Sequence, residues 1–261
     1  YHAAAFTDLK CNDIKKFYNT NVLGTEHVLK SALKHKIKKL IYTSTLSVYG
    51  PALYHVPITE NQPRLKSIDN DYELTKTMSE ELIRSYINKG LTCCILNVSR
   101  VYGPGPNTYS NGVNKIFKKI LNDKILVVPS KLNIEANYVY IDDVIDAQIK
   151  ALIKGENGEN YIIGGENVDY EQLFGMAKQV ANNNIKIVKI NYKLLKALIV
   201  IQDKLSKLLF LKPLVTPKVL DSLFTNRSAT ASKAVKTLGY QITPLHKGIQ
   251  KTIKFLNTQP L

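Results

Sequence analysis

The segment Leu91-Thr92-Cys93-Cys94-Ile95-Leu96-Asn97-Val98 is a near-continuous apolar run of strand length. Such a run is typical of a parallel strand that helices cover on both faces. It follows a helix expected over 72–89 and leads into the turn-rich loop Gly103-Pro104-Gly105-Pro106-Asn107. Upstream, an amphipathic pattern over 14–33 precedes a β-prone stretch over 39–44. This alternation of helices and strands predicts an α/β fold.

The alternation continues beyond the loop and then changes character near residue 165. We expect helices over 113–121 and from Asp142, which would cap its helix, and strands over 125–128, 138–141 and 161–163. From Tyr170 onward the pattern is mainly helical, with a β-like interruption over 185–190. A smaller domain could therefore fold against the sheet after residue 165.

The chain has a formal net charge of +15, and its lysines are spread over almost every segment. An anionic partner such as nucleic acid or lipid headgroups would explain this charge, but a solvated lysine-rich surface explains it with fewer assumptions, and we expect no nucleic acid partner. The three cysteines, Cys11, Cys93 and Cys94, are too few and too poorly spaced for a disulfide framework or a zinc site. We therefore expect a reducing, cytoplasmic setting and no metal.

No apolar stretch reaches the roughly 18 uninterrupted residues that a membrane span needs, because charged residues interrupt even residues 194–211. Residues 192–211 have two interpretations. One is a helix of the C-terminal part packed on the core, which we expect. The other is an interfacial helix with its lysines reaching toward anionic lipid, giving a weak membrane-surface contact.

A tyrosine and a lysine four residues apart, Tyr72 and Lys76, begin the helix expected over 72–89. This spacing places both side chains on one helical face. A tyrosine hydroxyl is a poor acid or base near neutral pH, since its reference pKa is about 10. A neighbouring ammonium favours the phenolate and so lowers that pKa. The spacing is common in a lysine-rich chain, so its meaning depends on the motifs around it.

Further motifs accompany this pair in a fixed order. Asn21-Val22-Leu23-Gly24-Thr25 lies in the preceding helix, the hydroxyl-rich segment 43–50 ends the preceding strand, and Arg100-Val101-Tyr102-Gly103 follows the next strand. Together they resemble the extended short-chain dehydrogenase/reductase family, also called the NAD-dependent epimerase/dehydratase family. The segments 138–144 and 232–249 extend the resemblance over nearly the whole chain.

The resemblance implies a Rossmann-like, doubly wound parallel sheet with a smaller C-terminal substrate-binding domain, and NAD or NADP as the cofactor. Residues 1–165 would form the catalytic part of the NAD(P)-binding domain, with some later segments returning to the sheet. Residues 166–261 would form the mainly helical substrate-binding domain. Relatives pair through two long helices, which here contain Asn21 and Tyr72, so the resemblance also implies a homodimer.

The resemblance also implies roles for individual residues. Tyr72 would be the catalytic acid/base, Lys76 its pKa partner, Thr45 the catalytic hydroxyl and Asn21 the support of the proton relay. Ser47 and Arg100 would contact the substrate. The cofactor would be contacted by the following residues: Ala3, Ala4, Ala5, Thr43, Lys76, Val98 and Ser99.

Two departures from the family pattern stand out. The family has a glycine-rich turn that binds the cofactor phosphates, about 20 positions before the residue that contacts the cofactor ribose. This turn does not occur in the sequence. We therefore expect roughly 60 residues upstream of Tyr1, two units of the βαβ scale, and the choice between NAD and NADP stays open. Asn97-Val98 stands where many relatives carry Arg-Pro, which concerns the nicotinamide contacts and not the fold.

The residues after Thr45 narrow the chemistry. Sugar-nucleotide 4,6-dehydratases of this family place Asp-Glu there, because elimination of water needs an additional acid and base. This chain has Leu46 and Ser47, which disfavours that route. We expect hydride transfer between nicotinamide and a secondary alcohol or ketone, as in the dihydroflavonol-4-reductase-like or 3β-hydroxysteroid dehydrogenase-like branch. A nucleotide-sugar 4-epimerase with tightly bound NAD and a non-catalytic NAD(P)-binding scaffold or sensor are the alternatives.

Overall fold

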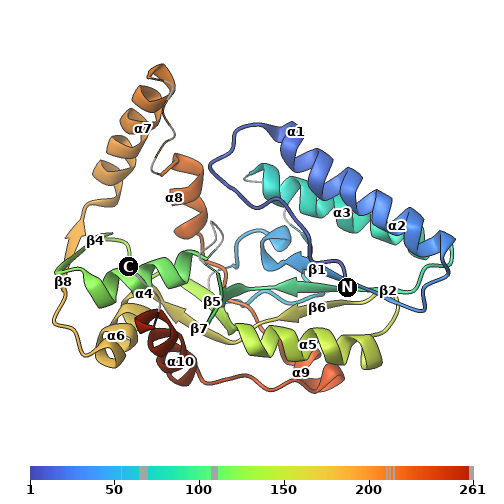
Figure 1. The fold of residues 1–261 in the computed structure, drawn as a ribbon. Helices are drawn as coiled ribbons and strands as arrows, with labels where there is room; N and C mark the ends of the chain where they lie inside the picture. Colours follow the sequence, from blue (N-terminus) through green and yellow to red (C-terminus); the bar gives the residue numbers. More distant parts are fainter. Residues whose placement is uncertain are drawn as a thin grey trace.

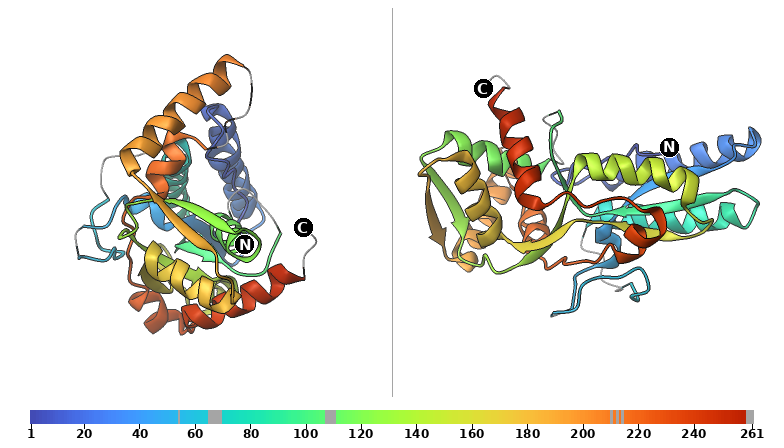
Figure 2. Two further views of the ribbon diagram at one scale, coloured as in Figure 1. Left: turned by 90° about the vertical axis from the view of Figure 1, so that its left-hand side faces the viewer. Right: turned by 90° about the horizontal axis from the view of Figure 1, so that it is seen from below.

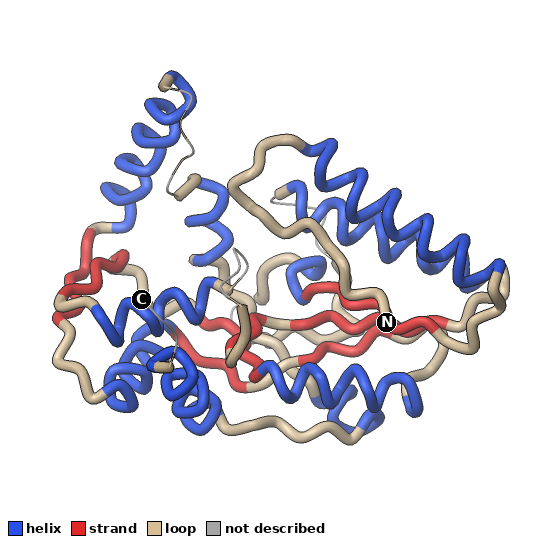
Figure 3. Tube along the Cα trace, in the orientation of Figure 1, coloured by secondary structure: helices blue, strands red, loops and turns tan. Residues whose placement is uncertain are grey.

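The structure is a computed structural model that describes residues 1–53, 55–64, 70–106, 111–209, 211, 213 and 215–258. Helices and strands alternate along the chain and form layers, with strands between helices (Figure 3). This arrangement is the α/β fold that the sequence predicts. Asn107, the last residue of the expected turn, lies outside the described residues.

The central sheet is parallel, with the strand order β1-β2-β6. Its strands are β1 (Leu40–Thr45), β2 (Cys93–Val98) and β6 (Asn160–Ile163). Every residue of β2 and β6 is buried. The near-continuous apolar run of the sequence is thus a strand covered on both faces, as expected for a parallel sheet.

Alternate residues of β2 enter two separate cores, because successive side chains of a strand point to opposite faces. Cys93 and Ile95 pack with α2 (Gly24–Lys34) and α3 (Asp71–Ile87) on one face. Cys94 and Leu96 pack on the other face with α5 (Ile141–Lys154) and α9 (Ser232–Leu238). Figure 1 shows the two helical layers above and below the sheet.

Residues 14–34 form one helical run, which confirms the long helix that the apolar spacing over 14–33 predicts, but the run is not α-helical throughout. It consists of α1 (Ile14–Phe17), a π-helical turn (Tyr18–Leu23) and α2. The hydroxyls of Thr25 and Ser79 both donate to the carbonyl of Asn21 within this turn. Wide turns of this kind are frequent at functional sites, where they accommodate such additional bonds.

A second layered region lies beyond the carboxyl ends of the central strands. Its strands are β3 (Arg100–Tyr102), β4 (Ile125–Pro129), β5 (Glu135–Tyr140), β7 (Glu166–Asp169) and β8 (Lys186–Ile190). They form one sheet in the order β3-β5-β7 and a parallel pair β4-β8. The helices α4 (Gly112–Asn122), α6 (Tyr170–Ala181) and α10 (Leu245–Asn257) contribute to one apolar core with these strands.

Helix α5 begins one residue earlier than the sequence predicted, and its cap is different. Tyr140 is the N-cap and makes no side-chain capping bond, while Asp142 lies in the first turn. The expectation that Asp142 caps the helix was therefore wrong, because β5 continues directly into the helix. Asp143 is engaged from the C-terminal segment instead, accepting bonds from the backbone N–H and the hydroxyl of Thr243 at 2.7 and 2.6 Å.

The helices α7 (Tyr192–Leu208) and α8 (Pro217–Leu223) form an arm at one end of the molecule. α7 packs mainly against α8 and projects away from the sheets (Figures 1 and 2). The expectation that this segment packs on the core was wrong, since several of its leucines are exposed. Among the described residues no helix is long and apolar enough to cross a membrane.

Candidate active site

The Tyr-x-x-x-Lys pair lies in the first two turns of α3. The side chain of Asn70 caps this helix by accepting a bond from the Glu73 backbone N–H at 2.9 Å, which fixes where the helix starts. Tyr72 then falls in the first turn, and Lys76 lies one turn further along the same face. The packing of α3 against β1 and the turn after it brings both residues to the carboxyl end of the sheet.

The Tyr72 side chain lies near Thr45, the last residue of β1, and interacts with its hydroxyl. Burial raises the pKa of Tyr72 to about 12, and the neighbouring Glu73 carboxylate acts in the same direction. The interaction with Thr45 acts in the opposite direction, because it favours the phenolate. In this structure Tyr72 is therefore a protonated donor.

Lys76 is almost fully buried at the same edge of the sheet. Its ammonium donates to the hydroxyl of Tyr42 at 2.7 Å and to the backbone carbonyl of Thr43 at 2.8 Å. It also lies 4.1 Å from the centre of the Tyr42 ring. Burial lowers the pKa of Lys76 to about 7, while the carboxylate of Glu80 one turn further along the helix opposes this shift. Lys76 can therefore change its charge near neutral pH.

Thr45 and Ser47 form a hydroxyl pair in the turn after β1. The Oγ atoms of Thr45 and Ser47 are 3.0 Å apart, and Thr45 Oγ1 also accepts a bond from the Ser47 backbone N–H at 3.2 Å. This bond caps the short 3₁₀ helix Leu46–Tyr49. The predicted residues Tyr72, Thr45 and Ser47 are thus brought together.

An ion pair beside these hydroxyls was not singled out in the sequence. Arg227 donates to the Glu73 carboxylate at 2.6 Å and to the Ser47 carbonyl at 3.1 Å. Both side chains of the ion pair are nearly fully buried. The residues are 154 positions apart, so no local sequence pattern connects them. The only available signal was the position of Glu73 directly after Tyr72.

Asn21 supports the site from the π-helical turn. Its side-chain amide forms two bonds with the Phe6 backbone, at 2.7 and 3.1 Å, and its Nδ2 is also 3.1 Å from Thr75 Oγ1. Asn21 thereby links the N-terminal segment to the residue that precedes Lys76. It acts here on backbone and hydroxyl groups next to the predicted relay.

The N-terminal segment that contains Ala3, Ala4 and Ala5 is fixed at both ends. Before it, His2 pairs in parallel with Tyr42 of β1. After it, Phe6 is held by Asn21. Ala3 and Ala4 are exposed and Ala5 is half-buried, so this segment lies at the surface beside the site.

The structure contains hydroxyls that fit a polar cofactor. Among the described residues, Thr43 Oγ1 and Ser99 Oγ are buried without a hydrogen-bond partner. Unpartnered buried polar atoms are rare, and a ligand is one explanation for them. Thr43 belongs to β1, and Ser99 directly follows Val98 at the end of β2. Both hydroxyls thus lie where the resemblance predicts contacts with the nicotinamide half of the cofactor.

A buried polar network behind the site explains the departure at Asn97. The Glu80 carboxylate accepts bonds from Asn97 Nδ2 at 2.8 Å and from Asn160 Nδ2 at 3.2 Å, and it is also paired with Ser44 and Arg64. Asn97 additionally donates to the carbonyl of Thr45 at 3.2 Å. The asparagine therefore connects the carboxylate below Lys76 with the strand end that carries the catalytic hydroxyl.

Arg100 lies apart from these residues. Its guanidinium donates to the Tyr170 hydroxyl at 2.7 Å and to the Leu223 carbonyl at 3.0 Å. Weaker bonds reach Tyr138 and the carbonyl of Ser222. Arg100 therefore fastens the end of α8 to the second sheet. Its predicted contact with the substrate stays a prediction.

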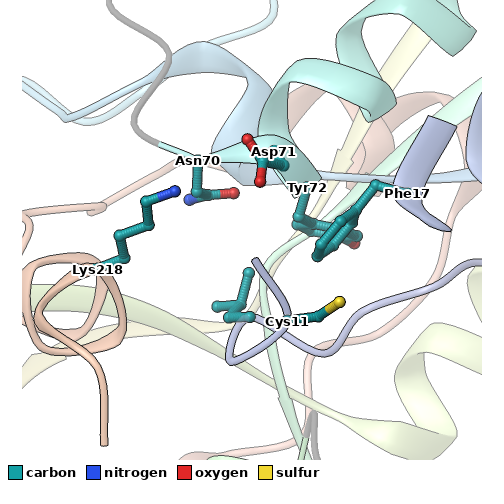
Figure 4. A pocket seen from close by; sticks show the side chains of 7 residues that line it. Cys11, Phe17, Asn70, Asp71, Tyr72 and Lys218 are labelled. Carbon is teal, nitrogen blue, oxygen red and sulfur yellow. The ribbon is translucent and has the colours of Figure 1, made fainter. Parts of the chain in front are cut away.

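A small pocket opens beside Tyr72 (Figure 4). Helix α8 contributes Lys218, whose ammonium points toward Asn70 in this view. Lys218 thus places a positive charge at the edge of this pocket. The pocket is lined by the following residues: Leu9, Cys11, Phe17, Asn70, Asp71, Tyr72 and Lys218.

Comparison with protein families gives one clear match. The model of the NAD dependent epimerase/dehydratase family matches residues 1–164, which is more than half of the chain. That range contains Tyr72, Lys76, Thr45 and the strands that position them.

Curated relatives differ in chemistry. The chain is 32% identical over 198 residues to a dTDP-D-glucose 4,6-dehydratase of Dictyostelium discoideum, an alignment that covers 70% of the chain and 44% of that protein. It is 26% identical over 270 residues to 3beta-hydroxysteroid-dehydrogenase/decarboxylase isoform 1 of Arabidopsis thaliana, covering 97% of the chain and 61% of that protein. The chain thus spans about half of the length of these two relatives.

Solved structures share the fold. The UDP-glucuronic acid 4-epimerase of Bacillus cereus, solved with UDP-glucuronic acid and NAD, superposes with a TM-score of 0.76 at 23% identity. The superposition covers 98% of this chain and 74% of that one. It confirms the Rossmann-like architecture expected from the sequence.

Proposed function

Because the chain belongs to the NAD-dependent epimerase/dehydratase family, we propose that it performs the proton-relay step of an NAD(P)-dependent oxidoreductase acting on a secondary alcohol or ketone. The observation that carries this proposal is the cluster at the end of β1. A tyrosine near the hydroxyl of Thr45 lies one helical turn from a buried lysine whose pKa is lowered to about 7.

The chain's own residues account for the proton chemistry. Thr45 Oγ1 and the Tyr72 hydroxyl are the two groups that would hold a substrate oxygen, and Tyr72 would donate the proton to it during reduction. When Lys76 is protonated, its charge favours the phenolate that remains on Tyr72. Asn21 and the Glu73–Arg227 ion pair keep α3 and the turn after β1 in place, and thus act as positioning residues.

The residues present fit a nicotinamide cofactor. Thr43, Ser99 and Lys76 would hold its nicotinamide half, together with the exposed backbone of residues 3–5. When bound, the cofactor supplies the hydride acceptor or donor, and the protein supplies orientation and the proton path.

Dehydration is disfavoured although a dehydratase is among the relatives. Leu46 lies in an apolar cluster and the Ser47 hydroxyl is bonded to Thr45, so neither residue after Thr45 supplies a carboxyl group. The neighbouring Glu73 is engaged by Arg227. These contacts support a reaction that needs one proton relay rather than an additional acid and base.

The test uses the complete gene product. Nicotinamide absorbance is followed with NADH and NADPH against ketones, flavanonols, 3-ketosteroids and UDP-sugars, and the products are analysed for epimers. Net oxidation of the cofactor with a ketone would support the proposal and identify the preferred cofactor. Inversion of a sugar without net turnover would replace the proposal by a 4-epimerase, which uses the same residues.

Substitution of Tyr72 tests whether the protein is an enzyme or a cofactor-binding scaffold. Tyr72→Phe should lower turnover about 100-fold or more, because general acid catalysis contributes about 10²- to 10⁴-fold. Binding of the cofactor should change little. The matched control is Tyr192→Phe, which removes a hydroxyl in the α7 arm that bonds to Asp221. Equal turnover of Tyr72→Phe and the wild type would refute the proposed relay.

A further inference from the structure

Helix α7 turns its apolar side chains outward. Residues spaced by four, three, four and three positions form one stripe along the helix, each between 51 and 74% exposed. We refer to this stripe as the α7 apolar stripe: Leu194, Leu198, Ile201, Leu205 and Leu208. The apolar surface continues past the end of the helix, where Leu209 and Leu211 are exposed to a similar extent.

The inward face of α7 carries both polar and apolar side chains, among them the half-buried Leu195 and Ile199. Asp203 and Ser206 are buried, although they belong to a helix at the edge of the molecule. Lys196 pairs with Asp221 of α8 at 2.7 Å, and this carboxylate also accepts a bond from Tyr192 at 3.1 Å. An ordinary surface helix places its apolar face on the core and its polar face outward. α7 has apolar side chains on its outward face as well as its inward face, and the exposed ones indicate that the α7 apolar stripe contacts something outside this chain.

Lysines predominate around the stripe. Between residues 191 and 221 the sequence contains six lysines and two acidic residues, Asp203 and Asp221, the second of which is paired with Lys196. Lys193 and Lys204 are exposed, whereas Asp203 is buried on the opposite side of α7. The outward surface of the arm is therefore apolar along its centre and cationic beside it.

We propose that α7 docks on an anionic lipid surface, lying flat with the α7 apolar stripe among the acyl chains. Its 17 residues span about 25 Å, the helix projects from the body (Figures 1 and 2), and its stripe residues are exposed in the part of the chain that the structure describes. Lys193 and Lys204 would then contact the phosphate groups. An amphipathic helix with lysines beside its apolar face is the usual form of such an anchor.

Charge also argues against a second copy of the chain as the occupant. A helix pair between copies is normally flanked by charges of both signs, which form salt bridges across the seam. Here two copies would bring exposed lysines together without an outward acidic partner on α7. The helix α5 provides a contrast, because its exposed isoleucines stand beside Asp142 and Asp146.

The proposal is tested by sedimentation of the complete gene product with phosphatidylcholine vesicles, with and without phosphatidylserine. We expect binding to the anionic vesicles that weakens as salt is added. Leu205→Gln/Leu208→Gln should lower the partition coefficient about tenfold for each leucine. Lys193→Gln/Lys204→Gln should lower it about fivefold for each lysine, and only on anionic vesicles.

The matched control is Ile149→Gln/Ile153→Gln, which changes two equally exposed residues on α5 and should leave vesicle binding unchanged. Thermal unfolding of each variant verifies the fold, and analytical ultracentrifugation measures its mass. No binding of the wild type to anionic vesicles would overturn the proposal. An α7 variant that turns a dimer into a monomer while vesicle binding persists would overturn it too, in favour of an interface between copies.

Discussion

The buried ammonium of Lys76 should make the stability of the fold depend on pH. Burial lowers the pKa of Lys76 from 10.5 to about 7, so between these values the folded chain binds fewer protons at this side chain than the unfolded chain. Stability rises with pH wherever the unfolded state binds more protons. The free energy of unfolding should therefore increase from pH 7 upward and level off near pH 10.5, where the unfolded lysine also loses its proton.

The size of this effect follows from the same pKa. One proton of difference changes the free energy of unfolding by about 1.4 kcal/mol per pH unit. The difference is about half a proton at pH 7 and close to one proton at pH 8 to 9. The expected gain between pH 7 and pH 9 is therefore about 2 kcal/mol.

The assay is urea unfolding of the cofactor-free protein at pH 7, 8 and 9, with Lys76→Met as the comparison. The variant cannot be protonated at this position, so the gain of about 2 kcal/mol should be absent from it. Other groups do not mimic the effect. His2, whose pKa is lowered to about 4, acts below this window, while Cys93 and Cys94 act near and above pH 9 and are present in both proteins. Parallel pH profiles for wild type and variant would refute the reasoning.

Two further predictions concern packing and the α8 contact. Gly248→Ala should lower the free energy of unfolding by about 1 to 3 kcal/mol, because the new methyl group would lie 2.1 Å from the hydroxyl of Tyr102. Gly175→Ala, in open space within α6, should raise it by up to about 1 kcal/mol, and urea midpoints that move in the same direction for both variants would contradict one of the two assignments. Arg100→Met should lower stability by about 1 to 3 kcal/mol through its lost partners. An unchanged urea midpoint with an increased KM would instead support the predicted substrate contact.

The sequence predicted the parts of the fold that local patterns determine. The apolar run 91–98 and the β-prone stretch 39–44 are strands, since residues buried on both faces leave a continuous signal. The hydroxyl pair and the Tyr-x-x-x-Lys spacing were visible for the same reason, as each lies within a few residues. The proximity of Tyr72 and Thr45 then follows from the packing of α3 against β1 and the turn after it.

Interactions between distant segments could not be predicted. Arg227 reaches Glu73 across 154 positions, and the bonds around Glu80 depend on the register of three strands. The orientation of α7 could not be predicted either. An apolar stripe shows that a helix is amphipathic, but not whether the body of the protein or a partner covers its apolar face. The exposure of Leu194, Leu198 and Ile201 shows that this stripe points outward.

The inward stripe of α3 shows how one helix serves both the site and the fold. Its buried positions recur every three or four residues, but the first members are charged and the last is apolar: Glu73, Lys76, Glu80 and Ile83. Burial of charges is costly unless each has a partner. Arg227 partners the first, Tyr42 and Thr43 the second, and Asn97, Asn160 and Arg64 the third. The charged residues lie toward the end of α3 that carries Tyr72, and Ile83 packs with apolar residues of β1 and β2, so the cost of the buried charges falls at the end of the helix that forms the candidate active site.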